Sequence, residues 1–121
     1  MGDLSPHFSK AEFADHSGAP FPPGIPSPKL IVKLEALRAA LGGKPITIVS
    51  GYRSPAHNKA VGGAKNSQHL RGRAADIKVE GVSPRVVADI AEAVFGWLSG
   101  IGRYDTFTHV DVRRSHARWT G

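Results

Sequence analysis

Two short stretches of alternating apolar and polar residues limit most strongly what this chain can fold into. Residues 74–79 alternate as a half-buried strand, with Asp76 on the polar face. Residues 107–113 alternate again, with β-branched residues on one face. The opposite face of this second strand carries, in order, Phe107, His109, Asp111 and Arg113. Such a face is expensive to bury unless its polar groups are used, so the pattern predicts two strands that build a functional site.

A turn brings a further histidine towards the first strand. Gly72 lies in a bend that lets the chain fold back, so that His69 can approach Asp76. A catalytic zinc ion takes three ligands from His, Asp or Glu and keeps a fourth position for water. We therefore predict that His69, Asp76 and His109 bind one Zn2+ ion. The alternative is an edge strand with a solvated polar face.

Composition sets the bounds for this prediction. The chain has 121 residues, and we expect residues 1–121 to form a single domain that buries its core without disulfides. There is no Cys, which excludes a thiolate metal site or a Cys nucleophile. No apolar run is as long as a membrane span, and the first residues do not resemble a signal peptide.

The charge balance favours a polyanionic partner. The net charge is +6 and the isoelectric point is near 10.1. Nucleic acid and an anionic cell wall both fit this charge. The sequence matches no nucleic-acid motif, and no aromatic residues interleave with the basic ones. We therefore expect no nucleic-acid partner.

The rest of the chain reads as scaffold around these strands. Ser27-Pro28 and Ser83-Pro84 each predict the start of a helix, and residues 46–50 predict a strand. The inner side of the second helix is predicted to hold six apolar residues: Val86, Val87, Ile90, Ala91, Val94 and Leu98. Residues 51–55 are expected to form a rigid turn and residues 59–66 a loop. Trp119 is expected to close over the core.

Arg53 stands in the rigid turn at the end of the predicted strand 46–50. Strand ends are a usual place for functional side chains. Its planar guanidinium could clamp a carboxylate or stabilise an oxyanion. The alternative is a structural arginine that bonds loop carbonyls.

Several spaced motifs, in this order, resemble those of the D-alanyl-D-alanine carboxypeptidase-like zinc peptidases. They are Ser50-Gly51-Tyr52-Arg53-Ser54-Pro55, His57-Asn58, Gly62-Gly63-Ala64, Ser67-Gln68-His69, Gly72-x-Ala74-x-Asp76 and Phe107-x-His109-Val110-Asp111. The group includes phage endolysins, bacterial wall endopeptidases and, more distantly, the hedgehog signalling domain. The likeness runs from Phe8 to Trp119. It implies an α+β fold, with a small antiparallel sheet that carries the zinc site and packs against two main helices.

The resemblance also implies roles for single residues. His69, Asp76 and His109 match the family's zinc ligands, and Arg53 matches the arginine thought to stabilise the substrate's carbonyl or carboxylate. Ser67 and Gln68 match the positions that flank the first ligand, where support of the histidine and contact with substrate are expected. His57 could border the cleft and bind substrate, with a structural role in its turn as the alternative.

The general base is where the sequence departs from the pattern. Many relatives carry Glu or Asp three positions before the last ligand, or His two before it. Here these positions hold Thr106 and Phe107, neither of which can act as a base. Asp111 is the leading candidate, and Asp105 follows it. A second register makes Asp111 the third ligand and His109 the base.

The resemblance implies zinc-dependent hydrolysis of a peptide bond in peptidoglycan stem peptides or crosslinks that contain D-amino acids. Zinc activates a water, and Arg53 stabilises the oxyanion. The alternatives are a catalytically inactive zinc-containing binding module and a nucleic-acid binder. We expect a monomer that acts on the cell wall after phage-type or assisted release, or as part of a virion. Carboxypeptidase and endopeptidase specificity both stay open.

Overall fold

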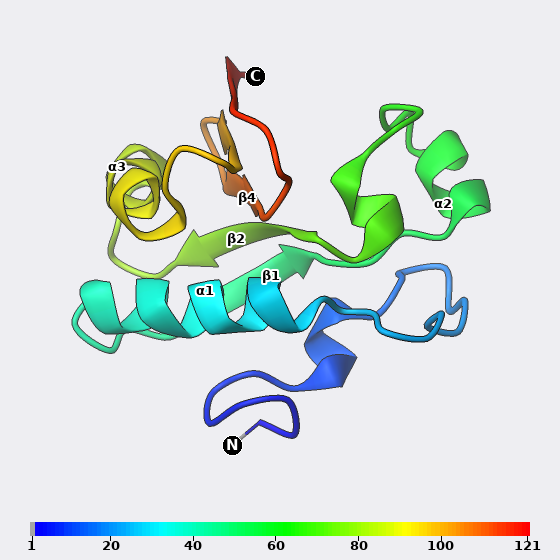
Figure 1. Ribbon diagram of the computed structural model, residues 1–121, viewed down its shortest axis with the longest axis horizontal. Coiled ribbons are helices and arrows are strands. Elements are labelled where there is room, and N and C mark those ends of the chain that lie inside the picture. Colours follow the sequence, from blue (N-terminus) through cyan, green and yellow to red (C-terminus); the bar gives the residue numbers. More distant parts are fainter. Residues whose placement is uncertain (1) are drawn as a thin grey trace.

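One five-stranded sheet organises the molecule (Figure 1). The computed structural model describes residues 2–121, so Met1, the first residue of the expected domain, lies outside the described residues. The strand order is β1-β2-β4-β3-β5, antiparallel throughout except for the β3–β5 pair. The strands are β1 (Ile46–Ser50), β2 (Ala74–Val79), β3 (Gly100–Arg103), β4 (Thr108–Asp111) and β5 (Ala117–Thr120). The predicted α+β class with a mainly antiparallel sheet is confirmed.

Two main helices pack against this sheet, as predicted. They are α1 (Pro28–Ala40) and α3 (Pro84–Phe95). Each begins with proline directly after a serine, a position where the missing proline N–H costs nothing. At the start of α3, the Ser83 hydroxyl accepts a hydrogen bond of 3.3 Å from the Val86 amide. This cap fixes where the helix begins.

The core lies between these helices and the sheet. Its fully buried large side chains include Leu30, Leu34, Leu37, Ile77, Ile101 and Val110. Phe8 and Phe13 are also buried and pin the N-terminal arm to the body. A short 3-10 helix, η1 (Lys10–Phe13), follows Ser9, whose amide donates a 2.6 Å hydrogen bond to Glu12.

The predicted inner face of the second helix is partly wrong. Val86 is 44% exposed and Leu98 is 56% exposed. The helix ends at Phe95, and Gly96 follows with φ of +79°, so Leu98 lies beyond the helix and outside its periodicity. Val87 and Ala91 are buried as expected.

Several short elements were not predicted, among them α2 (Pro55–Ala60) and β5. The expected turn at residues 51–55 leads directly into α2, whose six residues are too few to show a helical period. Ser54 caps it by accepting a 3.2 Å hydrogen bond from the His57 amide. The second element, β5, has only four residues and lies at the sheet edge, so its sequence carries no clear alternation.

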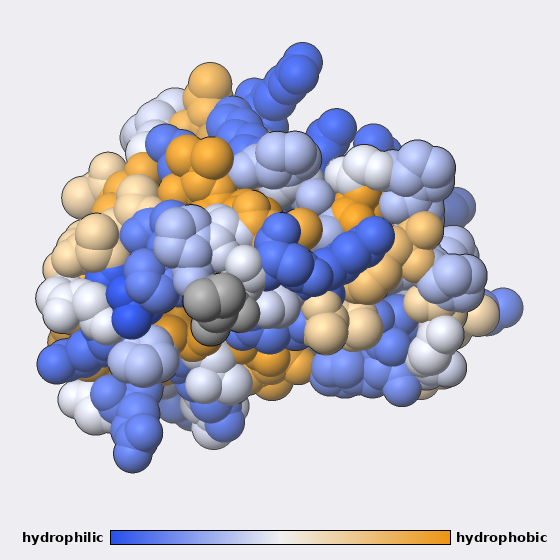
Figure 2. Space-filling view, turned by 90° about the horizontal axis from the view of Figure 1, so that it is seen from below, coloured by the Kyte–Doolittle hydropathy of each residue, from blue (hydrophilic) through white to orange (hydrophobic). Residues whose placement is uncertain are grey.

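Segments from different parts of the chain lie on the two sides of β2. Figure 1 shows α2 and the C-terminal strands on one side of β2, with the N-terminal arm on the other. Seen from the side of that arm, hydrophobic and hydrophilic patches alternate over the surface (Figure 2). None of the helices in residues 2–121 has the length and apolar character needed to span a membrane.

Candidate metal centre

Two of the three predicted ligands are direct partners across the sheet. Asp76 of β2 pairs with His109 of β4 in antiparallel register. Directly opposed residues project to the same face at close range. His109 Nδ1 accordingly lies 2.9 Å from Asp76 Oδ1.

The third predicted ligand comes from a turn. His69 lies in the 3-10 helix η2 (Gln68–Arg71), which ends at Gly72 with φ of +62°. A Cβ at Gly72 would come within 2.3 Å of the Ile25 side chain, so glycine suits both the backbone and the packing. The turn places His69 Nε2 3.3 Å from Asp76 Oδ1.

Together these residues form a compact cluster of ligand atoms. One nitrogen from each histidine and one oxygen from Asp76 lie within 4.8 Å of one another, and all three residues are buried. Two imidazoles and one carboxylate are the donors of many catalytic zinc sites. Nearby, Gln68 Oε1 is buried without a hydrogen-bond partner among the described residues. A buried acceptor of this kind calls for a water or ion, so the residues fit a hydrated divalent metal.

Each histidine is oriented by a group behind it. His69 Nδ1 donates a 2.7 Å hydrogen bond to the Gly51 carbonyl, which directs Nε2 towards Asp76. His109 Nε2 donates a 2.8 Å hydrogen bond to Asp111 Oδ2, which directs Nδ1 towards Asp76. Support of a metal-binding histidine by a carbonyl or a carboxylate is typical of metal sites.

Asp111 is held by a dense set of donors. Its side chain is fully buried. Oδ1 accepts from the Gly100 amide at 2.8 Å and from Arg113 Nε at 2.9 Å, and Oδ2 accepts from Arg113 Nη2 at 2.7 Å. A Cβ at Gly100 would lie 2.2 Å from Asp111 Oδ2. Glycine at position 100 therefore makes room for this carboxylate.

Hydrogen bonds within the cluster lower the pKa of each carboxyl and raise the pKa of His109. Burial alone would raise the pKa of Asp76, but hydrogen bonds from His109 and His69 hold it below its usual range. Burial likewise opposes ionisation of Asp111, and hydrogen bonds from His109 and Arg113 lower its pKa. Burial would lower the pKa of His109, but Asp111 and Asp76 raise it.

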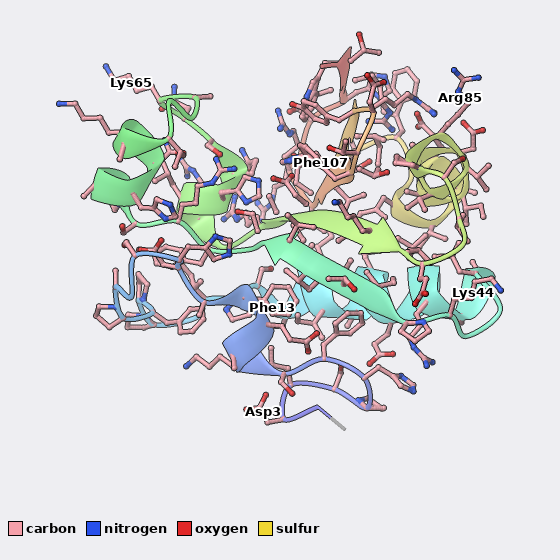
Figure 3. The ribbon with its side chains drawn as sticks, turned by 180° about the vertical axis from the view of Figure 1, so that it is seen from behind. Asp3, Phe13, Lys44, Lys65, Arg85 and Phe107 are labelled. Carbon is pink, nitrogen blue, oxygen red and sulfur yellow. The ribbon has the colours of Figure 1, made fainter. Side chains whose placement is uncertain are left out.

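The cluster opens into a cavity of about 510 Å³. One wall is formed by residues 61–64 and 66–68, and the other carries Tyr104, Phe107, Arg113 and Trp119. Figure 3 shows Phe107 on the side of the C-terminal strands that faces the segment with Lys65. The aromatic wall was not predicted as part of the site. Phe107 on the polar face of its strand was the signal that could have revealed it.

Trp119 lies in this wall and not over the core as expected. Its ring centroid is 4.9 Å from that of His109, and its Nε1 donates a 2.9 Å hydrogen bond to the Tyr104 hydroxyl. Gly102 is the β3 residue paired with both His109 and Trp119. A Cβ there would meet the Trp119 ring at 2.6 Å. The missing side chain lets the indole reach the site.

The structure places three more of the predicted site residues in the cavity lining. Arg53 lies with Nη2 3.5 Å from Asp76 Oδ2, and its Nη1 donates a 3.3 Å hydrogen bond to Asn58. The Ser67 hydroxyl accepts a 3.2 Å hydrogen bond from the His69 amide. Gln68 also lines the cavity.

The remaining predicted residues lie outside the lining. His57 is in α2, and its Nδ1 is hydrogen-bonded to the buried Asp15. Asp105 lines a separate cavity, with Ser83 and Arg85. Asp111 sits behind His109 and is not part of the cavity wall.

The protein has an α+β fold, and two histidines and one aspartate gather at its cavity as candidate ligands for a metal ion. These features are typical of metal-dependent enzymes. Comparison with known proteins specifies the family. Residues 6–111 match the Peptidase M15 family, so the chain belongs to that family. The match ends at Asp111, before Arg113 and β5.

Curated relatives agree with this assignment. A stretch of 45 residues, 37% of this chain and 18% of the relative, is 56% identical to the zinc D-Ala-D-Ala carboxypeptidase of Streptomyces albus G. Over 94 residues the chain is 34% identical to the peptidoglycan L,D-endopeptidase MepK of Escherichia coli K12 and 36% identical to the probable MepK of Haemophilus influenzae. These alignments cover 70% of this chain and 50% of each relative. The chain thus matches half or less of the length of these relatives.

Proposed function

We propose that this chain is a zinc-dependent peptidase that hydrolyses a peptide bond in peptidoglycan stem peptides or crosslinks. The observation that carries the proposal is the His69, Asp76 and His109 cluster at the floor of a cavity, in a chain of the Peptidase M15 family. The names of the relatives, a zinc carboxypeptidase and two peptidoglycan endopeptidases, support the same substrate class. We further propose that residues 1–121 form one catalytic domain that works as a monomer at the cell wall.

The proposed chemistry divides the work among the cavity residues. His69, Asp76 and His109 would hold the zinc ion, which when bound supplies Lewis-acid chemistry and lowers the pKa of water to about 7. Arg53, beside Asp76 in the lining, directs its guanidinium to the oxygen on which charge develops. Ser67 and Gly51 fix the backbone and ring of His69. Gln68 offers a polar amide to the substrate.

We assign Asp111 to positioning His109 and not to proton transfer. A general base must come within hydrogen-bond reach of the proton that it removes. Asp111 is fully buried, and both of its oxygens already accept hydrogen bonds from His109 or Arg113. The same geometry favours His109 as the ligand and disfavours the register in which Asp111 binds the metal.

The acid–base groups of the cavity lining suggest a second candidate function. Among the described residues of the lining, the carboxylate is Asp76 and the imidazoles are His69 and His109, all three proposed ligands. A cleft without a separate carboxylate or imidazole base fits a zinc-containing binding module for a cell-wall peptide or protein. Measured turnover decides between this module and the peptidase.

The deciding experiment is digestion of purified peptidoglycan, with the products analysed by mass spectrometry. We expect the zinc-loaded protein to release fragments whose masses identify the bond, and a chelator to stop the release. His69→Ala should lose both zinc and activity, whereas His16→Ala, which changes an exposed histidine outside the lining, should keep both. A zinc-loaded wild type that releases nothing would reject the peptidase and leave the binding module.

A further inference from the structure

Arg113 is the one described residue of the aromatic wall that carries a full charge. Its guanidinium lies over the Trp119 ring, with Cζ 5.3 Å from the ring centroid. Its side chain is about a quarter exposed, so it is neither buried nor free in solvent. A guanidinium supported by an indole face keeps its charge at a defined place.

The bonds of Arg113 to Asp111 use only one edge of the guanidinium. Nε donates to Oδ1 at 2.9 Å and Nη2 donates to Oδ2 at 2.7 Å, so Asp111 occupies the Nε/Nη2 edge. A guanidinium has five N–H donors in a planar fork. Both N–H groups of Nη1 and the second N–H of Nη2 remain, and within residues 2–121 Nη1 has no hydrogen-bond partner. These donors form the Nη1/Nη2 edge, which can hold a second carboxylate in a bidentate pair.

Arg53 and Arg113 both line the cavity and are connected through the ligand cluster. A continuous chain of contacts joins Arg53 to Asp76 (3.5 Å), Asp76 to His109 (2.9 Å), His109 to Asp111 (2.8 Å) and Asp111 to Arg113 (2.7 Å). A peptide bound in the cavity can therefore reach two arginines, Arg53 and Arg113.

We propose that Arg113 is a specificity-determining residue that binds a free carboxylate of the substrate through its Nη1/Nη2 edge, against the aromatic wall. This rests on the proposed peptidase function and extends it to substrate choice. The substrate class is an acidic peptide with a carboxylate on the side of the scissile bond that faces β4 and β5. The family match ends at Asp111 and so does not include Arg113 or Trp119.

The test compares substrates that differ in a single charge. The parent is a stem pentapeptide containing diaminopimelate, and in each of its analogues one free carboxylate is replaced by a carboxamide. For the wild type, one of these replacements should lower kcat/KM roughly 10- to 100-fold, mainly through KM, because it removes a charge-assisted bidentate pair. In Arg113→Gln the same analogue and the parent should be cleaved at similar rates.

Two further measurements separate this role from a structural one. Arg114→Gln removes the same charge from the neighbouring exposed arginine and should keep the wild-type ratio of acid to amide. Zinc affinity, measured by competition with a chelator, reports any disturbance of Asp111 and His109. If Arg113 only braces Asp111, acid and amide substrates will slow together in Arg113→Gln and their ratio will not change.

The outcomes also distinguish this inference from the proposed function. A wild type that cleaves every amide analogue as well as the parent rejects the carboxylate site but keeps the peptidase. A wild type that cleaves none of the peptides counts against the peptidase on these substrates. Binding of the parent and amide peptides to the zinc-loaded protein, measured by calorimetry, then tests Arg113 directly, and equal affinities would overturn the proposal.

Discussion

The two walls of the cavity hold their histidines by different means. One wall is formed by residues that follow α2, and we call it the α2 side. Here the backbone carbonyl of Gly51 accepts the hydrogen bond of His69. The other wall, with Tyr104, Phe107, Arg113 and Trp119, is the strand side. Here the buried carboxylate of Asp111 accepts the hydrogen bond of His109, and Arg113 balances the charge of that carboxylate. Both arrangements turn a ring nitrogen towards Asp76. The orientation of His69 therefore depends on the position of the backbone, and the orientation of His109 depends on a charged side chain.

This difference teaches where each wall is vulnerable. A buried carboxylate destabilises the fold unless it is fully paired. Removal of either His109 or Arg113 as a partner would therefore leave the charge of Asp111 buried without full compensation. A carbonyl anchor carries no net charge and is lost only if the backbone moves. Single polar substitutions should therefore damage the strand side most, and packing changes should damage the α2 side most.

Asp111→Asn should have the largest effect on metal binding among these changes. It keeps the size of the side chain but removes the charge that pairs with His109 and Arg113. Loss of a partner behind a metal-binding histidine typically lowers metal affinity about 10- to 100-fold. Chelator competition with zinc measures this directly.

Asp89→Asn is the matched control for this substitution. Asp89 of α3 is exposed and pairs with Arg103 of β3, and such surface pairs contribute little. Its zinc affinity should equal that of the wild type. If Asp111→Asn also binds zinc as the wild type does, the carboxylate does not support His109 and the proposed contrast between the walls fails.

Gly51→Ala should have an intermediate effect, through the backbone. A Cβ at position 51 would lie 2.7 Å from the Phe13 Cα, which cannot move without disturbing the core. We expect the free energy of unfolding to fall by about 1–3 kcal/mol. The displaced carbonyl should lower the zinc affinity by less than about 10-fold. This is a smaller loss than the one expected when the side chain that supports a metal ligand is removed. Urea denaturation and zinc competition report the two effects.

Gly18→Ala separates the packing effect from simple backbone strain. Gly18 has φ of +84°, and a Cβ at this position would meet no atom within 4 Å, so alanine there strains the loop without touching the site. It should lose stability and keep zinc affinity. Equal zinc affinity in Gly51→Ala and Gly18→Ala would show that the Gly51 carbonyl does not orient His69.

The sequence was informative where local pattern and chemistry coincide. Alternation identified β2 and β4, and the same alternation placed His109 and Asp111 on one face. It could not decide which of these two is the better candidate ligand, because both project to the same side. That choice depends on register: Asp76 pairs with His109, while Asp111 pairs with Ala74.

Long-range packing explains what the sequence left out. Trp119 reaches the site only because β5 pairs in parallel with β3 across Gly102. A four-residue edge strand has no period that reveals such a partner. The role of Asp111 was also hidden, since its burial depends on the space that Gly100 leaves on the neighbouring strand β3.

Asp15→Asn should have the smallest effect on the metal and still destabilise the α2 side. Asp15 is buried, accepts a 2.6 Å hydrogen bond from the Ser17 hydroxyl and is hydrogen-bonded to His57 in α2, outside the cavity. Burial alone would raise the pKa of Asp15, but hydrogen bonds from Ser17, His57 and Ser54 hold it below its ordinary value. A lowered carboxyl pKa stabilises the fold above the unfolded value of about 3.9, and this contribution is lost as the pH falls through the folded value.

We therefore expect a gap in unfolding free energy of about 1–3 kcal/mol between the metal-free wild type and Asp15→Asn at pH 7. The gap should narrow as the pH falls from about 4 to about 2.5, because the Asp15 carboxyl of the unfolded wild type then binds a proton while that of the folded protein keeps its charge. Urea denaturation across this range measures it, and zinc affinity at pH 7 should be equal in both proteins. A gap that stays constant down to pH 2.5 would mean that Asp15 stabilises α2 by packing, whereas reduced zinc affinity would mean that the α2 side transmits charge to the metal as the strand side does.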